Sequence, residues 1–253
     1  MSISLIQQLL IKGNCGPITD IVDVLSLIVC GFLTAMKVII LRIYHSNMKV
    51  IINSAIEDWA TIKDDRCVNI MIRYAYSGRV IFIIQMIGAY AAGFPLIFSR
   101  LPFMSALWNE KKNITVYSVP IGPSCWILGE IDPSKYIAYF AFQSIQLFIV
   151  CTGYIGIDTY FFGIAMHVCG QYELLYNEFQ RFYDTQNPLH QKVKLSKFIN
   201  RHKHLLNVAN HFEQSFNLII LAQVAADTLL TSISGKFQNK KSFPGPIRRL
   251  CWY

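Results

Sequence analysis

The chain has 253 residues, of which 53% are hydrophobic and 15% charged, and its mean hydropathy is +0.37. An ordinary soluble domain is excluded, because a chain of this length with so few charged residues has too little polar surface to face water. The apolar residues also occur in blocks long enough to cross a bilayer. We therefore predict a single all-α membrane domain, an integral membrane helical bundle over residues 1–253.

The net charge of +8 does not indicate nucleic acid, because the 23 Lys and Arg lie mainly between the apolar blocks. Basic residues in such places face lipid headgroups, so the lipid bilayer is the expected partner. The seven cysteines are unevenly spaced and several lie inside apolar runs. We expect no obligatory disulfide, and Cys125 in a loop is the candidate for one.

Four apolar blocks are the expected transmembrane helices, at residues 21–42, 80–98, 136–166 and 212–234. The second block has 19 residues without a charge, which is enough to cross about 30 Å of hydrocarbon. The third is longer than one crossing, so tilt or projection beyond the membrane is expected. Lys37 near the end of the first block is expected to snorkel to the interface. The fourth block spans only if neighbouring helices cover Asp227.

The loops between the blocks predict the orientation. Residues 42–79 and the linker after the third block carry six Lys or Arg each, whereas residues 99–135 carry four. By the positive-inside rule the two richer linkers are cytoplasmic and the intervening loop is outside. That loop holds the sequon Asn113-Ile114-Thr115, and Asn113 is a candidate glycosylation site because sequons are used only on the lumenal side.

A cytoplasmic helical hairpin is predicted over residues 170–210. Apolar residues recur at helical spacing in the part that follows the third block, which predicts a helix continuing below the membrane. Asn187-Pro188 is expected to break it, and a second helix follows from about Gln191. Such a hairpin is a natural subunit contact. The tail, residues 236–253, is atypical because it is basic and resembles neither a span nor a new domain.

No catalytic motif is present: the chain has no P-loop, G-x-S-x-G elbow, H-E-x-x-H or paired C-x-x-C. We therefore predict no enzyme, catalytic residue, metal or cofactor. His202, His204 and His211 favour a solvated cytoplasmic face over a metal site, since His202 and His204 point to different sides of a helix. Asp158 and His167 on the third block are ionisable groups near the bilayer, which favours either a structural ion pair or a functional site.

Small and aromatic residues in the outer halves of the second and third blocks predict either close helix packing or an apolar ligand cavity. Such a cavity, with one or two polar groups, suits a small volatile hydrophobic ligand. The candidate ligand-binding residues are Ile87, Tyr90, Ala91, Phe94, Phe140, Gln143, Ser144 and Leu147.

Several segments resemble the seven-helix insect odorant receptors. They are Asp58-Trp59, MIRYAYSGR at 71–79, HVCGQYELL at 167–175, RHKHLL at 201–206 and the proline-bearing outer loop with Pro133. The resemblance covers about Lys37 to Ser234 and implies about four helices of a seven-helix fold, with a cytoplasmic anchor domain opening at His167. It implies an odorant-gated cation channel subunit in the plasma membrane of olfactory sensory neurons, in a hetero-tetramer with a coreceptor. The subunit-contact candidates are His167, Cys169, Gln171, His202 and Leu205.

Members of that family have about 400 residues, so the resemblance implies that this chain lacks the first helix and the last two. The missing seventh helix lines the pore, and a chain of this form is not expected to conduct ions alone. The alternatives are a gustatory receptor, a membrane transporter or enzyme that uses Asp158 and His167, and a non-conducting interaction fragment.

Overall fold

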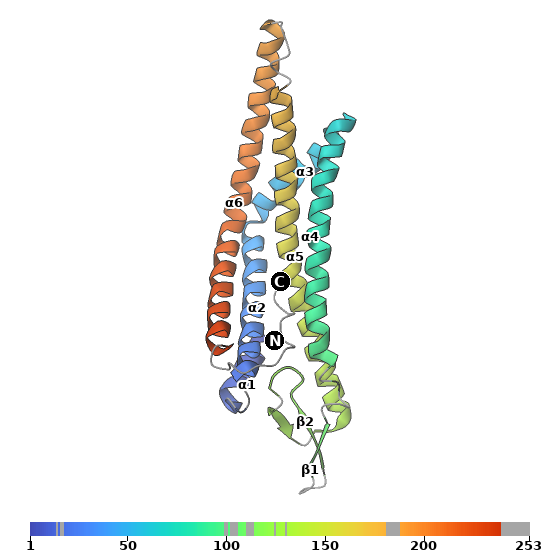
Figure 1. Cartoon of the computed structure of the whole chain (residues 1–253), viewed down its shortest axis with the longest axis vertical. Coiled ribbons are helices and arrows are strands. Elements are labelled where there is room, and N and C mark those ends of the chain that lie inside the picture. The colour runs from blue at the N-terminus through green and yellow to red at the C-terminus, as the bar shows by residue number, and fades with distance from the viewer. Residues whose placement is uncertain are drawn as a thin grey trace. The chain divides into compact units, whose positions relative to one another are not determined.

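The computed structural model describes residues 1–13, 15, 18–98, 101, 106–109, 114–123, 125–129, 131–180 and 188–238. The helices within this part are α1 (Ser2–Lys12), α2 (Ile18–Ile43), α3 (His45–Thr61), α4 (Asp65–Phe98), α5 (Pro133–Gln180) and α6 (Pro188–Gln238), as Figure 1 shows. The strands are β1 (Ala106–Asn109), β2 (Ile114–Ser118) and β3 (Ile127–Gly129). The predicted all-α membrane class is confirmed, since α2, α4, α5 and α6 are each long and apolar enough to cross a membrane.

Two of these helices are longer than any bilayer crossing. Helix α5 has 48 residues and α6 has 51, which at about 1.5 Å per residue is more than twice the hydrocarbon thickness of about 30 Å. The expected continuation of the third apolar block as a helix is confirmed. The sequence did not predict that the second hairpin helix and the fourth block form one uninterrupted helix.

Local sequence explains where the helices begin. The Asp64 carboxylate accepts the backbone N–H of Arg66 at 3.0 Å and caps α4. At the start of α5, Asp132 accepts the N–H of Ser134 at 3.4 Å, and Pro133 occupies the first helical position, where no N–H is needed. Pro188 has the same place in α6.

The structure adds elements that the apolar blocks did not predict. Residues 1–15 contain helix α1, and the linker after α2 is helix α3, which begins at His45 after the single residue Tyr44. The expected outer loop contains an antiparallel sheet of order β1-β2-β3. These segments are too short or too polar to stand out beside transmembrane helices.

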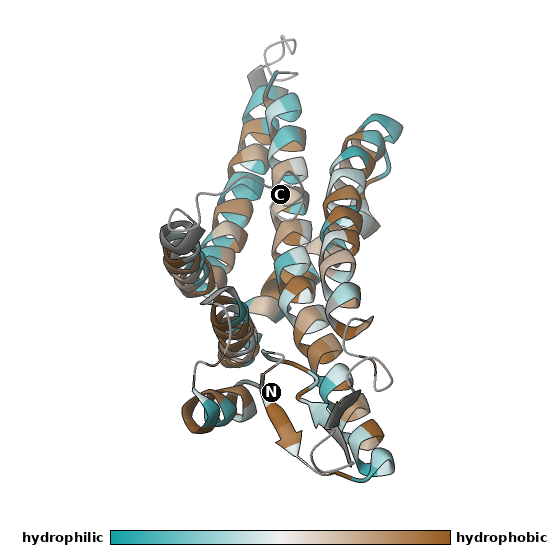
Figure 2. Ribbon diagram, turned by 60° about the horizontal axis from the view of Figure 1, so that its bottom comes forward, coloured by the Kyte–Doolittle hydropathy of each residue, from teal (hydrophilic) through white to brown (hydrophobic). Residues whose placement is uncertain are grey.

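Two compact units are distinguishable in the chain. Unit 1 comprises residues 1–36, 86–155 and 222–253, and unit 2 comprises residues 37–85 and 156–221. Hydrophilic colour is visible in Figure 2 at the beginning of α4 and the end of α5, both in unit 2. Many large hydrophobic side chains on the long helices remain exposed, as expected for surfaces that face lipid.

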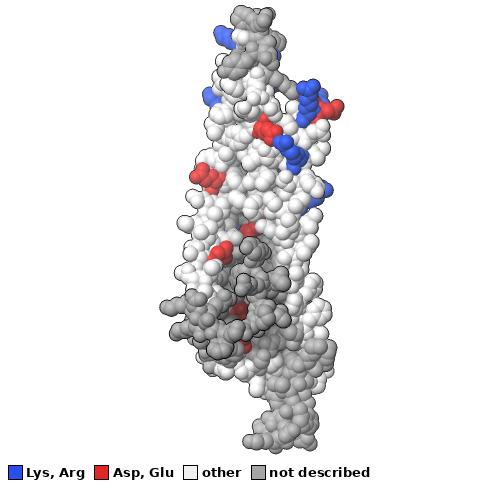
Figure 3. Space-filling model, viewed as in Figure 1, with Lys and Arg blue, Asp and Glu red and all other residues white. Residues whose placement is uncertain are grey.

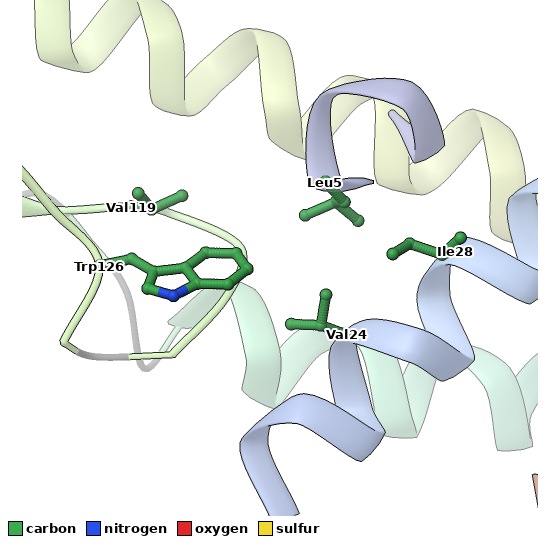
Figure 4. Close-up of a cluster of buried hydrophobic side chains, with 5 residues drawn as sticks. All are labelled: Leu5, Val24, Ile28, Val119 and Trp126. Carbon is green, nitrogen blue, oxygen red and sulfur yellow. The ribbon is translucent and has the colours of Figure 1, made fainter. Parts of the chain in front are cut away.

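The core of unit 1 joins α1, α2 and the segment between β2 and β3. Leu5, Val24, Ile28, Val119 and Trp126 form a buried cluster (Figure 4). Trp126 has no exposed surface and its indole N–H donates to the Gly13 carbonyl at 3.2 Å. The buried Tyr136 at the start of α5 stacks on Tyr117 at 4.3 Å between ring centroids and donates its hydroxyl to the Ser118 carbonyl. These contacts attach the sheet to the helices.

Unit 2 contains a buried ion pair between α2 and α5. The Lys37 ammonium donates to an Asp158 carboxylate oxygen at 2.6 Å, and the side chains are 0% and 18% exposed. The expectation that Lys37 snorkels to the interface is wrong, because a facing carboxylate neutralises its charge inside the unit. The structural interpretation of Asp158 is supported, although its partner is on α2 and not in a cytoplasmic linker.

Two histidine contacts attach helix α3 to the rest of unit 2. Ser54 lies 2.9 Å from the ring of His204 on α6, and the Asp58 carboxylate lies 3.1 Å from the ring of His167 on α5. Ser54 and Asp58 are four residues apart and therefore share one helix face. On the face drawn in Figure 3, the visible Lys and Arg gather in the upper part of the view.

Candidate ligand-binding cavity

Unit 1 contains a cavity of about 120 Å³ between α2, α4, α5 and the segment that follows β2. Asp20, Asp23, Val24 and Leu27 line it from α2, and Ile97 lines it from α4. Its other walls are Phe140, Ser144 and Leu147 from α5 and Pro120, Ile121 and Gly122 from the segment after β2.

The lining determines which molecules suit this cavity. Most of the wall is aliphatic or aromatic, so an apolar body is favoured inside it. Asp20 and Asp23 supply carboxylates, which accept hydrogen bonds but do not donate them when ionised, and Ser144 supplies a hydroxyl. Pockets for drug-sized ligands are about 300–1,000 Å³. The cavity therefore suits a smaller molecule with an apolar body and a hydrogen-bond donor.

The structure brings together only some of the predicted ligand-binding residues. Phe140, Ser144 and Leu147 line the cavity. Tyr90 and Phe94 instead pack against Phe148 of α5, at 6.1 and 5.8 Å between ring centroids, and the Tyr90 hydroxyl lies 2.9 Å from that of Thr152.

Ile87 and Ala91 lie on an exposed face of α4. None of the α2 residues that line the cavity was predicted from the sequence as a binding residue. Asp23 could have indicated their role, because it is an ionisable group inside an apolar block.

Gln143 has a different place from the other α5 candidates. It is 3% exposed, and its side-chain amide donates to the Tyr139 hydroxyl at 2.7 Å. Gln8 of α1 donates to the same hydroxyl at 2.9 Å. Within the described part of the chain, the side-chain carbonyl oxygens of Gln8 and Gln143 are buried without a donor. This network attaches α1 to α5, and a donor that reached it would be strongly favoured.

The segment between β2 and β3 is fixed in place at the cavity wall. Cys125, the candidate from its position in a loop, is bonded to Cys15 in a disulfide, although no obligatory disulfide was expected. The partner was not evident because 110 residues separate the two cysteines in sequence. The Lys12 ammonium donates to the Ile127 carbonyl at 2.6 Å, and partial burial lowers the pKa of Lys12.

Gly122 permits Trp126 to fold back over this segment. Its φ is +143°, and a Cβ at this position would lie 2.7 Å from the Trp126 ring. We expect Gly122→Ala to lower the free energy of unfolding by about 2–4 kcal/mol, since it adds both backbone strain and a steric clash. Thermal unfolding of the chain in lipid nanodiscs measures this change.

Gly129→Ala is the matched control. Gly129 has a φ of +87°, but a Cβ there would meet nothing within 4 Å, so this variant adds backbone strain without the clash. Equal losses for the two variants would show that the close contact with Trp126 has no effect on stability.

The predicted subunit-contact residues are distributed between the interior and the surface of unit 2. Gln171 is fully buried and accepts a hydrogen bond from Arg201 at 2.5 Å, and Leu205 is 2% exposed. Cys169 and His202 are exposed, and His202 stacks on Phe198. Gln171 thus joins α5 to α6 within this chain, and Leu205 is buried in unit 2.

The remaining candidates are also separated. Asp158 bonds to Lys37 while His167 bonds to Asp58, so the two residues do not form a common site in unit 2. No group of three or more His, Cys, Asp or Glu arranged for a metal ion occurs among the residues that the structure describes. Asn113 and the tail beyond residue 238 lie outside the described residues.

In the described part of the chain, four helices long and apolar enough to cross a membrane define a multi-pass membrane protein. The model of the 7tm Odorant receptor family matches residues 17–235. The chain therefore belongs to the odorant receptor family, which is a receptor family and not an enzyme family. No curated protein matches the chain.

Proposed function

We propose that this odorant receptor binds a small volatile organic molecule in the cavity of unit 1 and acts, together with a coreceptor, in an odorant-gated cation channel. The main support for this proposal is the cavity, because it combines apolar walls with a few polar groups in a chain of this family. The carboxylates of Asp20 and Asp23 favour ligands with a hydroxyl or amino group over esters and ketones, which have no donor.

The proposed site of action is the plasma membrane of olfactory sensory neurons, with a hetero-tetramer as the assembly. Binding would favour the open state to the extent that the ligand binds it better than the closed state. The exposed residues of the α5–α6 hairpin, Cys169 and His202 among them, are the proposed contacts with other subunits.

The test is a comparison of two phenylalanines on α5. Phe140 lines the cavity, whereas Phe142 is 59% exposed on the same helix. The chain is co-expressed with a coreceptor, and currents are recorded against a panel of small alcohols, amines and esters. We expect Phe140→Ala to raise the half-maximal ligand concentration about tenfold, since a contact of about 1.4 kcal/mol is lost.

Phe142→Ala is expected to respond like the unchanged chain. Equal effects of the two variants would argue against the cavity as the binding site. Assembly with the coreceptor, measured by co-purification, separates a ligand-site defect from a failure to assemble.

A further inference from the structure

Unit 2 contains a second hollow, of about 350 Å³, on the outside of α3, α4 and α5. Its lining includes Trp59 of α3, Tyr74, Gly78, Arg79 and Phe82 of α4, and Gly163 of α5. This hollow, here called the inner groove, has no role in the function proposed above. Its residues come from the beginning of α4, on the side of the membrane that the loop charges predict to be cytoplasmic.

Two glycines form a smooth floor in the inner groove. A Cβ on Gly78 would lie 3.8 Å from the Gly163 Cα, so α4 and α5 approach closely there. A Cβ on Gly163 would meet nothing within 4 Å, so the space beside it is open. The open space beside these glycines, here called the trough, is also lined by Phe82 and Met166, and its apolar lining suits an acyl chain.

The charge at the end of the trough is positive. Arg79 is exposed and immediately precedes the 19 uncharged residues of α4, so its guanidinium lies at the boundary between hydrocarbon and headgroups. The other titratable side chains in the lining are His167, which is paired with Asp58, and Tyr74, which is hydrogen-bonded to Glu173. Within the part of the chain that the structure describes, no carboxylate forms a salt bridge with Arg79. A planar guanidinium in this position fits a phosphate with two hydrogen bonds.

Two aromatic residues that suit the membrane–water interface also line the groove. Trp59 is 43% exposed and Tyr74 is half-buried, and both are in the lining. Trp and Tyr are enriched at the membrane–water interface, where an apolar ring and a polar tip are both satisfied. Arg79 and Tyr74 therefore lie towards the beginning of α4, and Phe82 lies within its 19 uncharged residues, which provides a polar end for a phospholipid headgroup and an apolar end for an acyl chain.

We propose that the inner groove is a binding site for a phospholipid of the leaflet in which α4 begins. The phosphate pairs with Arg79, and one acyl chain lies over Gly78 and Gly163 against Phe82. The groove shares no lining residue with the cavity of unit 1. The test of lipid binding is therefore independent of the test of odorant binding.

The test uses photo-crosslinking of the full chain in phosphatidylcholine vesicles that contain a phosphatidylcholine with a diazirine on its acyl chain. After irradiation, mass spectrometry locates and quantifies the adducts. We expect adducts on the peptides that carry residues 74–82 and 159–167. Two variants remove the site in different ways: Arg79→Gln removes the charge, and Gly163→Leu fills the trough. Each is expected to lower labelling of these peptides about tenfold.

Two matched controls accompany these variants. Arg66→Gln removes an exposed charge from the same helix outside the groove, and Gly156→Leu adds the same side chain to α5 at an open position outside the lining. Both are expected to label like the unchanged chain. Circular dichroism and thermal unfolding confirm that all four variants fold.

Equal labelling of Gly163→Leu and Gly156→Leu would overturn the site. Unchanged labelling in Arg79→Gln would overturn the phosphate contact. A diazirine-bearing fatty acid forms the second arm. The proposal is wrong if the fatty acid labels the groove as strongly as the phospholipid and Arg79→Gln lowers neither labelling. The occupant would then be a free acyl chain.

Discussion

Lys37→Met is expected to lower the free energy of unfolding of the chain by about 3 kcal/mol. Removing one partner of a buried ion pair costs about 3–5 kcal/mol, because the other charge remains desolvated. The lower end applies here, since the Asp158 side chain keeps 18% of its surface exposed. Asp158→Asn is expected to have a similar effect, because the Lys37 ammonium has no exposed surface. The measurement is unfolding by increasing SDS in mixed micelles.

The double variant, Lys37→Met with Asp158→Leu, distinguishes a pair interaction from two separate effects. Replacing both charges by apolar groups is expected to restore stability to within about 1 kcal/mol of the unchanged chain. Lys49→Met on α3 is the control, as Lys49 is exposed. If the losses of the two single variants simply add in the double variant, the ion pair does not stabilise unit 2 in the way that its geometry indicates.

Cys15→Ser and Cys125→Ser are each expected to lower stability by about 2–4 kcal/mol, the usual range for a native disulfide. The bond joins residues 110 positions apart, so its loss frees the end of α1 from the wall of the ligand cavity. The double variant is expected to lose no more than either single variant, because each removes the same bond. Thermal unfolding in nanodiscs, with and without a reductant, measures the loss.

Thiol counting provides the chemical check on this disulfide. A maleimide reagent is expected to label two more cysteines in the unfolded chain after reduction than before. Cys169→Ser is the control, because Cys169 is a free and exposed cysteine outside the bond. In that variant the difference of two thiols stays the same and the stability is unchanged. Equal labelling before and after reduction would contradict the bond.

The fold class was predictable because a bilayer imposes a simple rule on sequence. Backbone groups in hydrocarbon must be satisfied within the segment, so an apolar block of sufficient length is a helix. The blocks at 80–98 and 136–166 meet that rule, and both lie within the long helices α4 and α5. Helix α3 and the sheet were missed, because outside hydrocarbon the same residues can take several structures and only packing selects one.

The candidate cavity was predictable in part. Phe140, Ser144 and Leu147 were identified from the mixture of small, polar and aromatic residues in one block. The same pattern was misleading for Tyr90 and Phe94, which pack against Phe148. Helical spacing shows which residues share a face, but it does not show whether that face meets a neighbouring helix, a cavity or lipid.

By itself, the sequence determined that this chain is a helical membrane protein and, through its motifs, that it belongs with the odorant receptors. Both follow from local properties, since hydropathy and short motifs are read within a few turns of helix. The tertiary structure alone decided that Lys37 meets Asp158, that Cys15 bonds to Cys125, and that Asp20 and Asp23 join the cavity wall. Each of these contacts joins residues about 100 or more positions apart, or depends on the rotation of one helix against another. That rotation is set by the packing of all the side chains together, and no local pattern records it.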